Sequence, residues 1–485
     1  MKVNLYNVRS KSLNLMTKTQ GVYIIAAYTV IIYVITWIFS RGYGKTKLQF
    51  LLAERLVGKW QSAFSIAATW VWAPSLFIAA QKAYLHGIAG VFWFTVPNVA
   101  CLIIFAFFAD RIRKLLPDGF TLSGFIRTRF SRRVQIMYLV ELFGLATCSF
   151  AVQLLAGAKI LTMVTGMSYL LITFLMAAIA IVYSAVYGLK ASVITDYFQM
   201  VLIIVVGGLL IGWSVSEAGG FSTIAAGLGG KSGTYISLLS TDSLELALTF
   251  GIPVTIGLLA GPFGDQSFWQ RAFATERQHV KSAFIWGALI FALVPLIMSQ
   301  LGFIAAGSGL VVHDPATVNL ETVLAFLPPW TIVPFIFVLL SGLVSTLDSN
   351  LCAISSLVGH DIIDELSWQS EVKDRSPVIS RLSMVVVSII AIAIANIPNL
   401  KIVHLFLFYG TLRASTLLPT IMTIMGKNLS DKGLFYGIIL SLAIGLPLFA
   451  YGNFANSTIF IICGSLFTVL SSGTMAVLWK IESRG

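Results

Sequence analysis

The chain has 485 residues, of which 57% are hydrophobic and 11% charged, and its formal net charge is +12. Soluble domains carry roughly 25% charged residues, so this composition, with a mean hydropathy of +0.89, excludes an ordinary soluble protein. Abundant aromatic residues exclude a disordered chain. The basic residues stand between apolar runs, which indicates membrane orientation rather than nucleic-acid binding.

Long apolar runs follow one another along the whole chain. A helix that crosses the hydrocarbon core of a bilayer needs about 20 apolar residues. Thirteen runs approach or exceed that length, which predicts an all-helical polytopic membrane protein. In chain order they are 21–40, 62–86, 88–109, 134–156, 160–187, 191–216, 245–262, 284–307, 325–358, 378–397, 402–425, 434–452 and 457–479.

The termini and loops predict an orientation. Residues 1–20 are polar and are expected to be an extracellular tail, followed by a retained helix rather than a cleaved signal peptide. Lys and Arg concentrate in loops 41–61 and 110–133, whereas loop 308–324 has none. Basic loops favour the cytoplasmic side. We expect a plasma-membrane protein with its N-terminus outside and its C-terminus in the cytoplasm.

Two residue types that often carry enzyme chemistry form no cluster here. The four cysteines lie in apolar runs without paired spacing, so we expect buried thiols rather than disulfides or metal ligands. The five histidines are scattered among loops and helix ends. An enzyme is therefore not expected. The cysteines are Cys101, Cys148, Cys352 and Cys463.

Two membrane runs contain Pro or Gly residues that interrupt a helix, which is unfavourable in lipid because backbone groups lose their hydrogen-bond partners. Pro74 lies near the middle of the second run, and the seventh ends in Gly261-Pro262-Phe263-Gly264-Asp265. A freed backbone at this depth is favoured where it lines a cavity. Broken helices in corresponding positions, here five runs apart, are typical of transporters built from inverted repeats. The alternative is that each proline only kinks its helix.

The ninth run contains hydroxyl side chains on one helix face. Gly342, Ser345 and Thr346 follow the spacing i, i+3 and i+4. Hydroxyls and a freed carbonyl are hard oxygen ligands for a small cation. Alternatively, the hydroxyls bond to the backbone or to a neighbouring helix.

Charged residues inside apolar runs are the remaining candidates, because a charge in the membrane needs a partner. Asp348, Asp196 and Glu141 are carboxylates of this kind, although Asp196 is close enough to a helix end to snorkel. Arg413 is the basic residue placed deep in a run. It could hold a substrate carboxylate by a bidentate pair, or it could be a counter-ion for Asp348 or Glu141.

These segments together resemble the sodium:solute symporter family, and their sequence is most similar to its urea/polyamine transporter branch. The resemblance runs over residues 21–425 and rests mainly on Thr69–Ala73, Asp265–Arg271 and the pair Ser345-Thr346. It implies a leucine-transporter-type fold with a 5+5 inverted repeat. The extra N-terminal helix would be 21–40, the repeats 62–216 and 245–425, and two peripheral helices would occupy 434–479.

The resemblance also implies the ion sites. A main sodium site would use carbonyls of Thr69, Trp72 and Gly342 with the hydroxyls of Ser345 and Thr346. A second cation or proton site would use Asp196, Asp348 and Ser349. Asp348 replaces a hydroxyl of the family pattern, so a shared proton is an alternative to a second sodium.

The sequence as a whole predicts sodium-coupled symport of a small organic solute by alternating access. Sodium would be the coupling ion, without an organic cofactor, and the partners would be the solute and the lipid bilayer. The solute would bind between the two broken helices against Trp70, Phe77, Phe263 and Arg413. The alternatives are a proton-coupled symporter that uses Asp196 and Asp348, or a solute sensor that does not transport.

Overall fold

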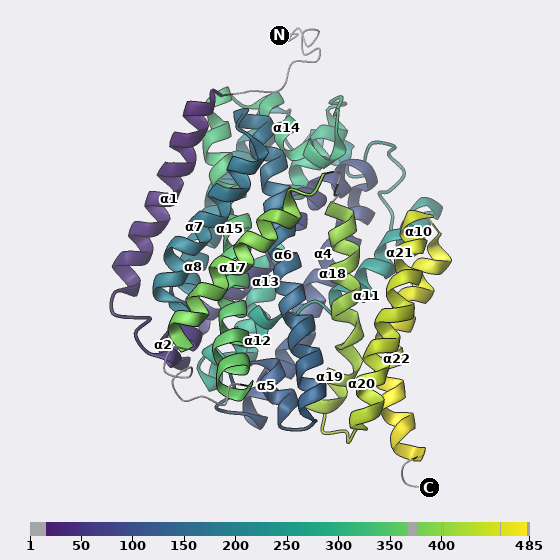
Figure 1. Cartoon of the computed structure of the whole chain (residues 1–485). Coiled ribbons are helices and arrows are strands. Elements are labelled where there is room, and N and C mark those ends of the chain that lie inside the picture. The colour runs from purple at the N-terminus through teal and green to yellow at the C-terminus, as the bar shows by residue number, and fades with distance from the viewer. Residues whose placement is uncertain (1–15, 367–375, 399, 401, 456, 483–485) are drawn as a thin grey trace.

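The computed structural model describes residues 16–366, 376–398, 400, 402–455 and 457–482. Within these ranges the regular elements are helices, apart from one isolated bridge between Val57 and Thr275. The chain enters at one end of the helical bundle and leaves at the other (Figure 1). Most of the predicted N-terminal tail, residues 1–15, lies outside the described residues.

Most of the long helices stand roughly along one axis. Eleven of them, among the described residues, are long and apolar enough to cross a membrane. They and the connecting helices are α1 (Lys18–Ser40), α2 (Lys47–Leu52), α3 (Lys59–Trp70), α4 (Ala73–Leu115), α5 (Leu122–Arg127), α6 (Arg132–Thr165), α7 (Tyr169–Tyr187), α8 (Leu189–Glu217), α9 (Phe221–Gly227), α10 (Thr241–Leu246), α11 (Ile252–Leu259), α12 (Gln266–Ala274), α13 (Val280–Gly307), α14 (Val318–Phe326), α15 (Ile332–Ser356), α17 (Ser376–Ala395), α18 (Ile402–Ser415), α19 (Leu417–Ile424), α20 (Asp431–Leu440), α21 (Leu446–Phe454) and α22 (Thr458–Glu482).

The predicted apolar runs fall on these helices. α4 carries parts of two runs, because non-helical angles at His86 and Gly87 interrupt it. Gly87 has φ 50, a conformation that favours glycine. The predicted run 402–425 corresponds to α18 and α19 together. The all-helical polytopic fold is therefore as predicted.

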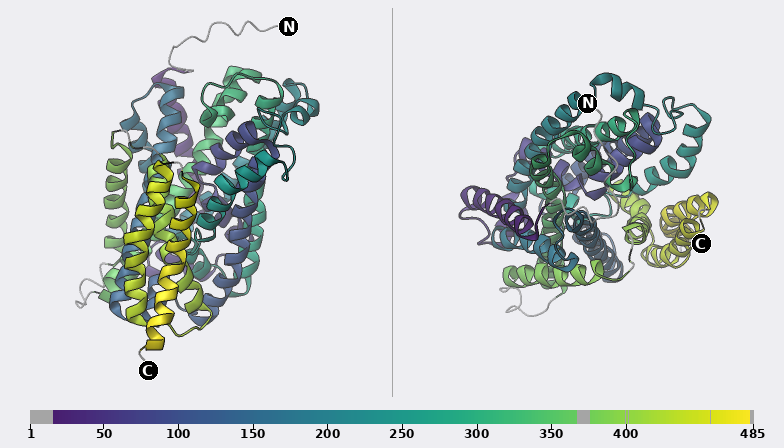
Figure 2. Two further views of the ribbon diagram at one scale, coloured as in Figure 1. Left: turned by 90° about the vertical axis from the view of Figure 1, so that its right-hand side faces the viewer. Right: turned by 90° about the horizontal axis from the view of Figure 1, so that it is seen from above.

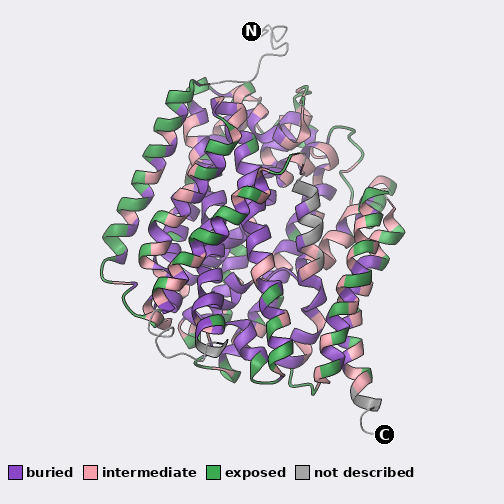
Figure 3. Cartoon of the chain, viewed as in Figure 1, coloured by how far each residue is buried: buried purple, intermediate pink, exposed green. Residues whose placement is uncertain are grey.

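The helices form a buried centre with flanking elements. α13 packs along α4 and α3, and α15 packs between α8 and α6. Seen from above, α1 and the α20–α22 group stand on opposite sides of the bundle (Figure 2). Buried residues concentrate in the central helices, and exposed ones follow the outer faces (Figure 3). The candidate residues therefore lie where several helices meet.

Both predicted interruptions are present. α3 ends at Trp70 and α4 begins at Ala73, with non-helical backbone between them, and Pro74 lies in the first turn of α4. Proline fits that place because the first turn of a helix needs no intrahelical N–H partner. The second break separates α11 from α12. Gly261 lies there against the Trp70 ring, where a Cβ atom would clash.

One prediction about the cysteines is wrong. Cys101, Cys148 and Cys352 are buried free thiols, but Cys463 is an exposed free thiol. Its helix, α22, packs on α20 and α21 and leaves its opposite face outside the bundle. An apolar run alone does not distinguish that outer face from the inner one.

Candidate functional site

The hydroxyl pair of α15 lies against the first helix break. Ser345 Oγ donates to Ala68 O at 2.9 Å, and Thr346 Oγ1 is 3.2 Å from Val71 O and 3.4 Å from Thr69 O. Both hydroxyls also lie within 3.3 Å of Gly342 O on their own helix. Two hydroxyl and four carbonyl oxygens therefore converge where α3 ends. This is a neutral, all-oxygen ligand set of the kind that hard cations prefer.

The carbonyl partners match the expected ones at Thr69, which lies 3.4 Å from Thr346 Oγ1, but not at Trp72. The resemblance implied Thr69 and Trp72, three residues apart. The structure brings Ala68 and Val71, which are also three residues apart, to Ser345 and Thr346. The Trp72 carbonyl instead accepts from Ser75 N at 2.9 Å, in the first turn of α4.

A buried ion pair lies beside this hydroxyl pair. Arg271 on α12 and Asp196 on α8 approach to 2.9 Å, with side chains 1% and 0% exposed. The same guanidinium contacts Ser65 on α3 at 2.8 Å and Ser349 on α15 at 2.7 Å. Ser65 Oγ also donates to Asp196 at 2.6 Å. One guanidinium thus ties together four helices that meet next to the first break.

Asp348 lies near this cluster but has different partners. Tyr183 Oη donates to it at 2.6 Å and Ser192 Oγ at 2.9 Å, and Thr195 Oγ1 lies at 3.1 Å. Ser349 Oγ is 3.3 Å from it and 3.0 Å from Thr69 Oγ1. The structure therefore brings Asp196, Asp348 and Ser349 together, as expected, within one network that reaches the main hydroxyl pair.

Arg271 is the principal residue for which the sequence pattern predicted no site. The predicted run ends at residue 262, which leaves Arg271 outside the apolar runs, although it belongs to the segment Asp265–Arg271 that carries the family resemblance. The structure continues the broken helix through α12, whose residues are all buried. The neighbouring Phe268, Trp269 and Phe273 are apolar residues that could have extended the run and placed Arg271 inside it.

A cavity of about 350 Å³ opens beside both breaks. The first break, α11 and α18 contribute Trp72, Gly257 and Arg413 to its wall. The wall is completed from α21 and α22, which were expected to be peripheral, by residues that include Phe449 and Ile461. Its volume falls in the range of small-molecule sites.

The four predicted solute contacts are not all at this cavity. Arg413 lines it, whereas Trp70, Phe77 and Phe263 do not. Phe263 packs between Phe105 and Phe108 of α4, with ring centroids 5.1 Å apart in both cases. Trp70 packs edge-on against Phe268 at 5.2 Å. Trp70 and Phe263 therefore pack between helices and do not line this cavity.

Arg413 and Glu141 do not pair with one another. The Arg413 guanidinium lies over the Tyr409 ring at 4.4 Å, an arrangement that stabilises a cation. Glu141 accepts from Ser415 Oγ at 2.8 Å. Neither Glu141 nor Asp348 forms an ion pair with Arg413, so the contacts expected of an internal counter-ion are not made.

A buried glutamine on α6 contacts the backbone where the first break ends. Gln153 is fully buried, and its Oε1 accepts from Ala73 N at 2.9 Å. Its amide nitrogen has no hydrogen-bond partner among the described residues. A buried amide donor without a partner has unused capacity to bind a polar ligand.

A family model described as the sodium:solute symporter family matches residues 50–441. The outward-open structure of a Na+-coupled sialic acid symporter has a TM-score of 0.77 at 18% identity, covering 94% of this chain and 97% of that one. This likeness supports the predicted leucine-transporter-type fold.

Curated relatives are transporters. Probable urea active transporter 1 of Schizosaccharomyces pombe is 25% identical over 66% of this chain and 51% of its own length. The urea-proton symporter DUR3 of Oryza sativa subsp. japonica is 22% identical, over 85% and 62%. The sodium/proline symporter of Staphylococcus aureus is 23% identical, over 79% and 76%. The chain thus spans about half of the first relative and less than two thirds of the second.

The family match covers most of the chain, and the apolar helices make it a multi-pass integral membrane protein. This chain belongs to the sodium:solute symporter family.

Proposed function

We propose that this chain is a secondary active symporter that couples the movement of a small organic solute to sodium by alternating access. The 5+5 repeat would comprise residues 62–216 and 245–425, after the extra helix 21–40. The helices at 434–479 would lie at the edge of this repeat. Each repeat then begins with one of the two broken helices, α3–α4 and α11–α12.

The observation that carries the proposal is the convergence of oxygens between the first break and α15. Sodium at this place would be held by hydroxyl and carbonyl oxygens of the cluster, namely the hydroxyls of Ser345 and Thr346 and the carbonyls of Ala68, Thr69, Val71 and Gly342. Because these groups belong to two separate helices, a bound ion links α3 to α15. Loss of the ion frees α3 to move relative to α15.

Alternating access requires that the link between α3 and α15 can form and break. The neighbouring contacts between these helices are weak enough to break as well. The Thr69–Ser349 hydroxyl contact of 3.0 Å joins the same two helices. A hydroxyl pair and a neutral ion site can exchange their partners with water at modest cost. The driving force is adequate, since one charge moved across 100 mV contributes about 2.3 kcal/mol.

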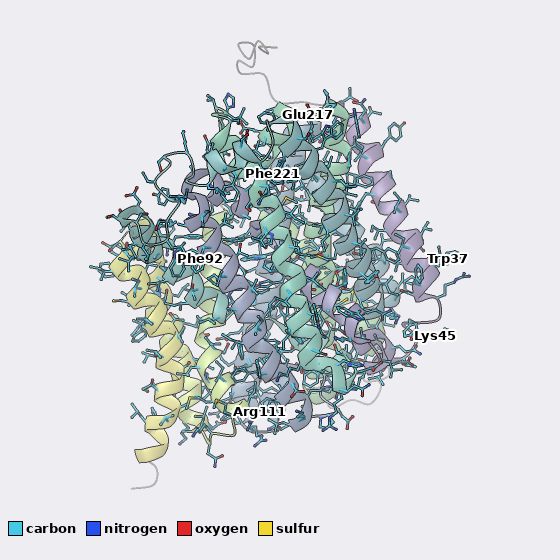
Figure 4. The ribbon with its side chains drawn as sticks, turned by 180° about the vertical axis from the view of Figure 1, so that it is seen from behind. Trp37, Lys45, Phe92, Arg111, Glu217 and Phe221 are labelled. Carbon is cyan, nitrogen blue, oxygen red and sulfur yellow. The ribbon has the colours of Figure 1, made fainter. Side chains whose placement is uncertain are left out.

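The proposed location is the plasma membrane, with the N-terminus outside and the C-terminus in the cytoplasm. α1 begins at one end of the molecule and α22 ends at the other (Figure 1). Lys45 and Arg111 lie toward the end opposite Glu217 and Phe221 (Figure 4). Basic residues at one end support its assignment to the cytoplasmic side.

Sodium titration of solute binding and uptake in proteoliposomes tests the proposal. Thr346→Ala removes one hydroxyl of the oxygen cluster and should raise the sodium concentration for half-maximal uptake at least severalfold. Thr423→Ala is a matched control, because Thr423 is buried but donates within its own helix to Pro419 O at 2.7 Å. Its sodium dependence should remain that of the wild type.

Three results would contradict the proposal. Uptake driven by a proton gradient and indifferent to sodium would favour proton coupling through Asp196 and Asp348. Saturable solute binding without uptake would favour a sensor. An unchanged sodium dependence in Thr346→Ala would remove the site assignment even if sodium drives uptake.

A further inference from the structure

Arg413 stands at the wall of the cavity as an almost fully buried cation. Its side chain is 2% exposed, and α18 places it next to Gly410 on the same wall. The backbone of Gly264, in the second helix break, packs directly against its Cβ atom. The guanidinium is therefore held between α18 and the break rather than at the surface.

The buried carboxylates of the bundle all have other hydrogen-bond or ion-pair partners, although Asp265, next to Gly264 in the second break, lies within electrostatic range of Arg413. Asp196 pairs with Arg271, and Asp348 accepts from hydroxyl groups. Glu141 accepts from Ser415, and Asp265 accepts from the backbone N–H of Ser267 at 2.8 Å. Among the described residues no carboxylate forms an ion pair with Arg413, and its Nε atom has no hydrogen-bond partner.

The cavity wall adds no compensating charge. None of its residues is acidic, and Arg413 is its one charged side chain among the described residues. Most of the wall is apolar. The apolar and aromatic part includes Trp72, Ile78, Phe94, Phe250, Val254 and Phe449, and the neutral polar part includes Asn453 and Ser465.

We propose that this cavity binds an organic monocarboxylate with an apolar body, whose carboxylate pairs with Arg413. The inference rests on the proposed symport function and names its substrate class. A charge at membrane depth requires a counter-charge, and a guanidinium binds a carboxylate through two parallel hydrogen bonds. The apolar wall and the cavity volume of about 350 Å³ suit the rest of such a molecule.

Other solute classes fit the wall less well. A neutral solute of the size of urea would leave the guanidinium without an ion-paired counter-charge and much of the apolar wall without contact. A polyamine would add positive charge next to Arg413. An anionic lipid headgroup shares the anion chemistry and could approach from α21 and α22. The wall nevertheless reaches Trp72, at the break where sodium is proposed to bind, which favours a transported solute.

The first test needs only the wild-type protein and a matched pair of probes. Phenylacetate and phenylacetamide have nearly the same shape but differ in charge. Purified protein in neutral-lipid nanodiscs with sodium should bind phenylacetate at least about tenfold more tightly than the amide. Equal affinity, tighter binding of the amide, or no binding by phenylacetate and its aliphatic counterpart hexanoate would overturn the proposal.

The second test determines whether Arg413 causes the preference for the acid over the amide. Arg413→Gln should bind the acid and the amide equally, whereas Arg413→Lys should keep part of the preference for the acid. A preserved acid preference in a folded Arg413→Gln protein would overturn the assignment. If that variant does not fold, the wild-type comparison and Arg413→Lys still decide the question.

Two further measurements distinguish a carboxylate solute from a lipid headgroup and from urea. Phosphatidylglycerol in the nanodiscs should leave phenylacetate affinity unchanged, and strong competition by the lipid would reassign the cavity to a headgroup. Sodium-driven uptake of urea without carboxylate binding would refute this inference and leave sodium coupling intact. Carboxylate binding that depends on Arg413 but not on sodium would support the inference and refute sodium coupling.

Discussion

Arg271 and Arg413 are two buried guanidinium groups in one bundle, and their surroundings are opposite. All three nitrogen atoms of Arg271 have hydrogen-bond partners, which include the carboxylate of Asp196. Arg413 has an aromatic ring beneath it and a cavity beside it, without an ion pair to the described residues. The comparison indicates that Arg271 holds helices together, whereas Arg413 is available to bind a ligand.

The largest expected effect comes from breaking the internal pair. Arg271→Gln leaves the fully buried Asp196 without its counter-charge and removes contacts to Ser65 and Ser349. We expect the free energy of unfolding to fall by about 3–5 kcal/mol. Chemical unfolding in detergent measures this, and the double variant Arg271→Gln with Asp196→Asn should recover much of the loss. Similar stability of the single variant and the wild type would contradict a structural role.

The same substitution at Arg413 should behave differently. Arg413→Gln removes a buried charge that forms no ion pair with a described carboxylate and has only the more distant attraction of Asp265, so the unliganded protein should lose less than about 1 kcal/mol of stability or become more stable. Unfolding measured under the same conditions as for Arg271→Gln makes the comparison direct. A loss as large as that of Arg271→Gln would indicate an internal partner and weaken the distinction between the two residues.

A smaller effect should follow from displacing Arg413 without removing it. Gly264→Ala places a methyl group against the Arg413 Cβ atom, so one of the two backbones must shift. Carboxylate affinity should fall severalfold, measured by isothermal titration with phenylacetate. Gly208→Ala on α8 is the matched control, since a Cβ atom there meets no other atom within 4 Å. Equal affinity in the two variants would show that Arg413 is not positioned by the second break.

The smallest effect is expected from an exposed ion pair. Lys114 lies 2.7 Å from Asp110, with side chains 60% and 22% exposed. Such i,i+4 pairs contribute about 0.3–0.5 kcal/mol because water and salt screen the charges. Lys114→Ala should therefore change the free energy of unfolding by no more than this amount. A loss of several kcal/mol would mean that burial does not determine how much the Lys114–Asp110 and Arg271–Asp196 pairs contribute to stability.

The fold and the hydroxyl pair could be predicted because their signals are local. Apolar length identifies a membrane helix, and Gly261-Pro262 or Pro74 marks a place where such a helix is broken. The i, i+3, i+4 spacing of Gly342, Ser345 and Thr346 is enough to place them on one face. These features depend on neighbouring residues in the sequence.

The remaining features depend on how helices pack against one another. Nothing local to Phe263 indicates that it packs against α4 instead of the cavity. The choice of Val71 over Trp72 as a carbonyl partner depends on where α3 unwinds relative to α15. Likewise, α21 and α22 form part of the cavity wall only because they pack beside α18. These contacts join helices that are distant in the sequence, so the local sequence pattern could not predict them.

The most direct test of a carboxylate site beside a sodium site is equilibrium binding of phenylacetate and phenylacetamide to the wild-type protein, each in sodium and in potassium. The acid should bind at least about tenfold more tightly than the amide, and its binding should weaken when potassium replaces sodium. An amide that binds as well as the acid would contradict the role of Arg413. Acid binding that is the same in both salts would contradict a sodium site at Ser345 and Thr346.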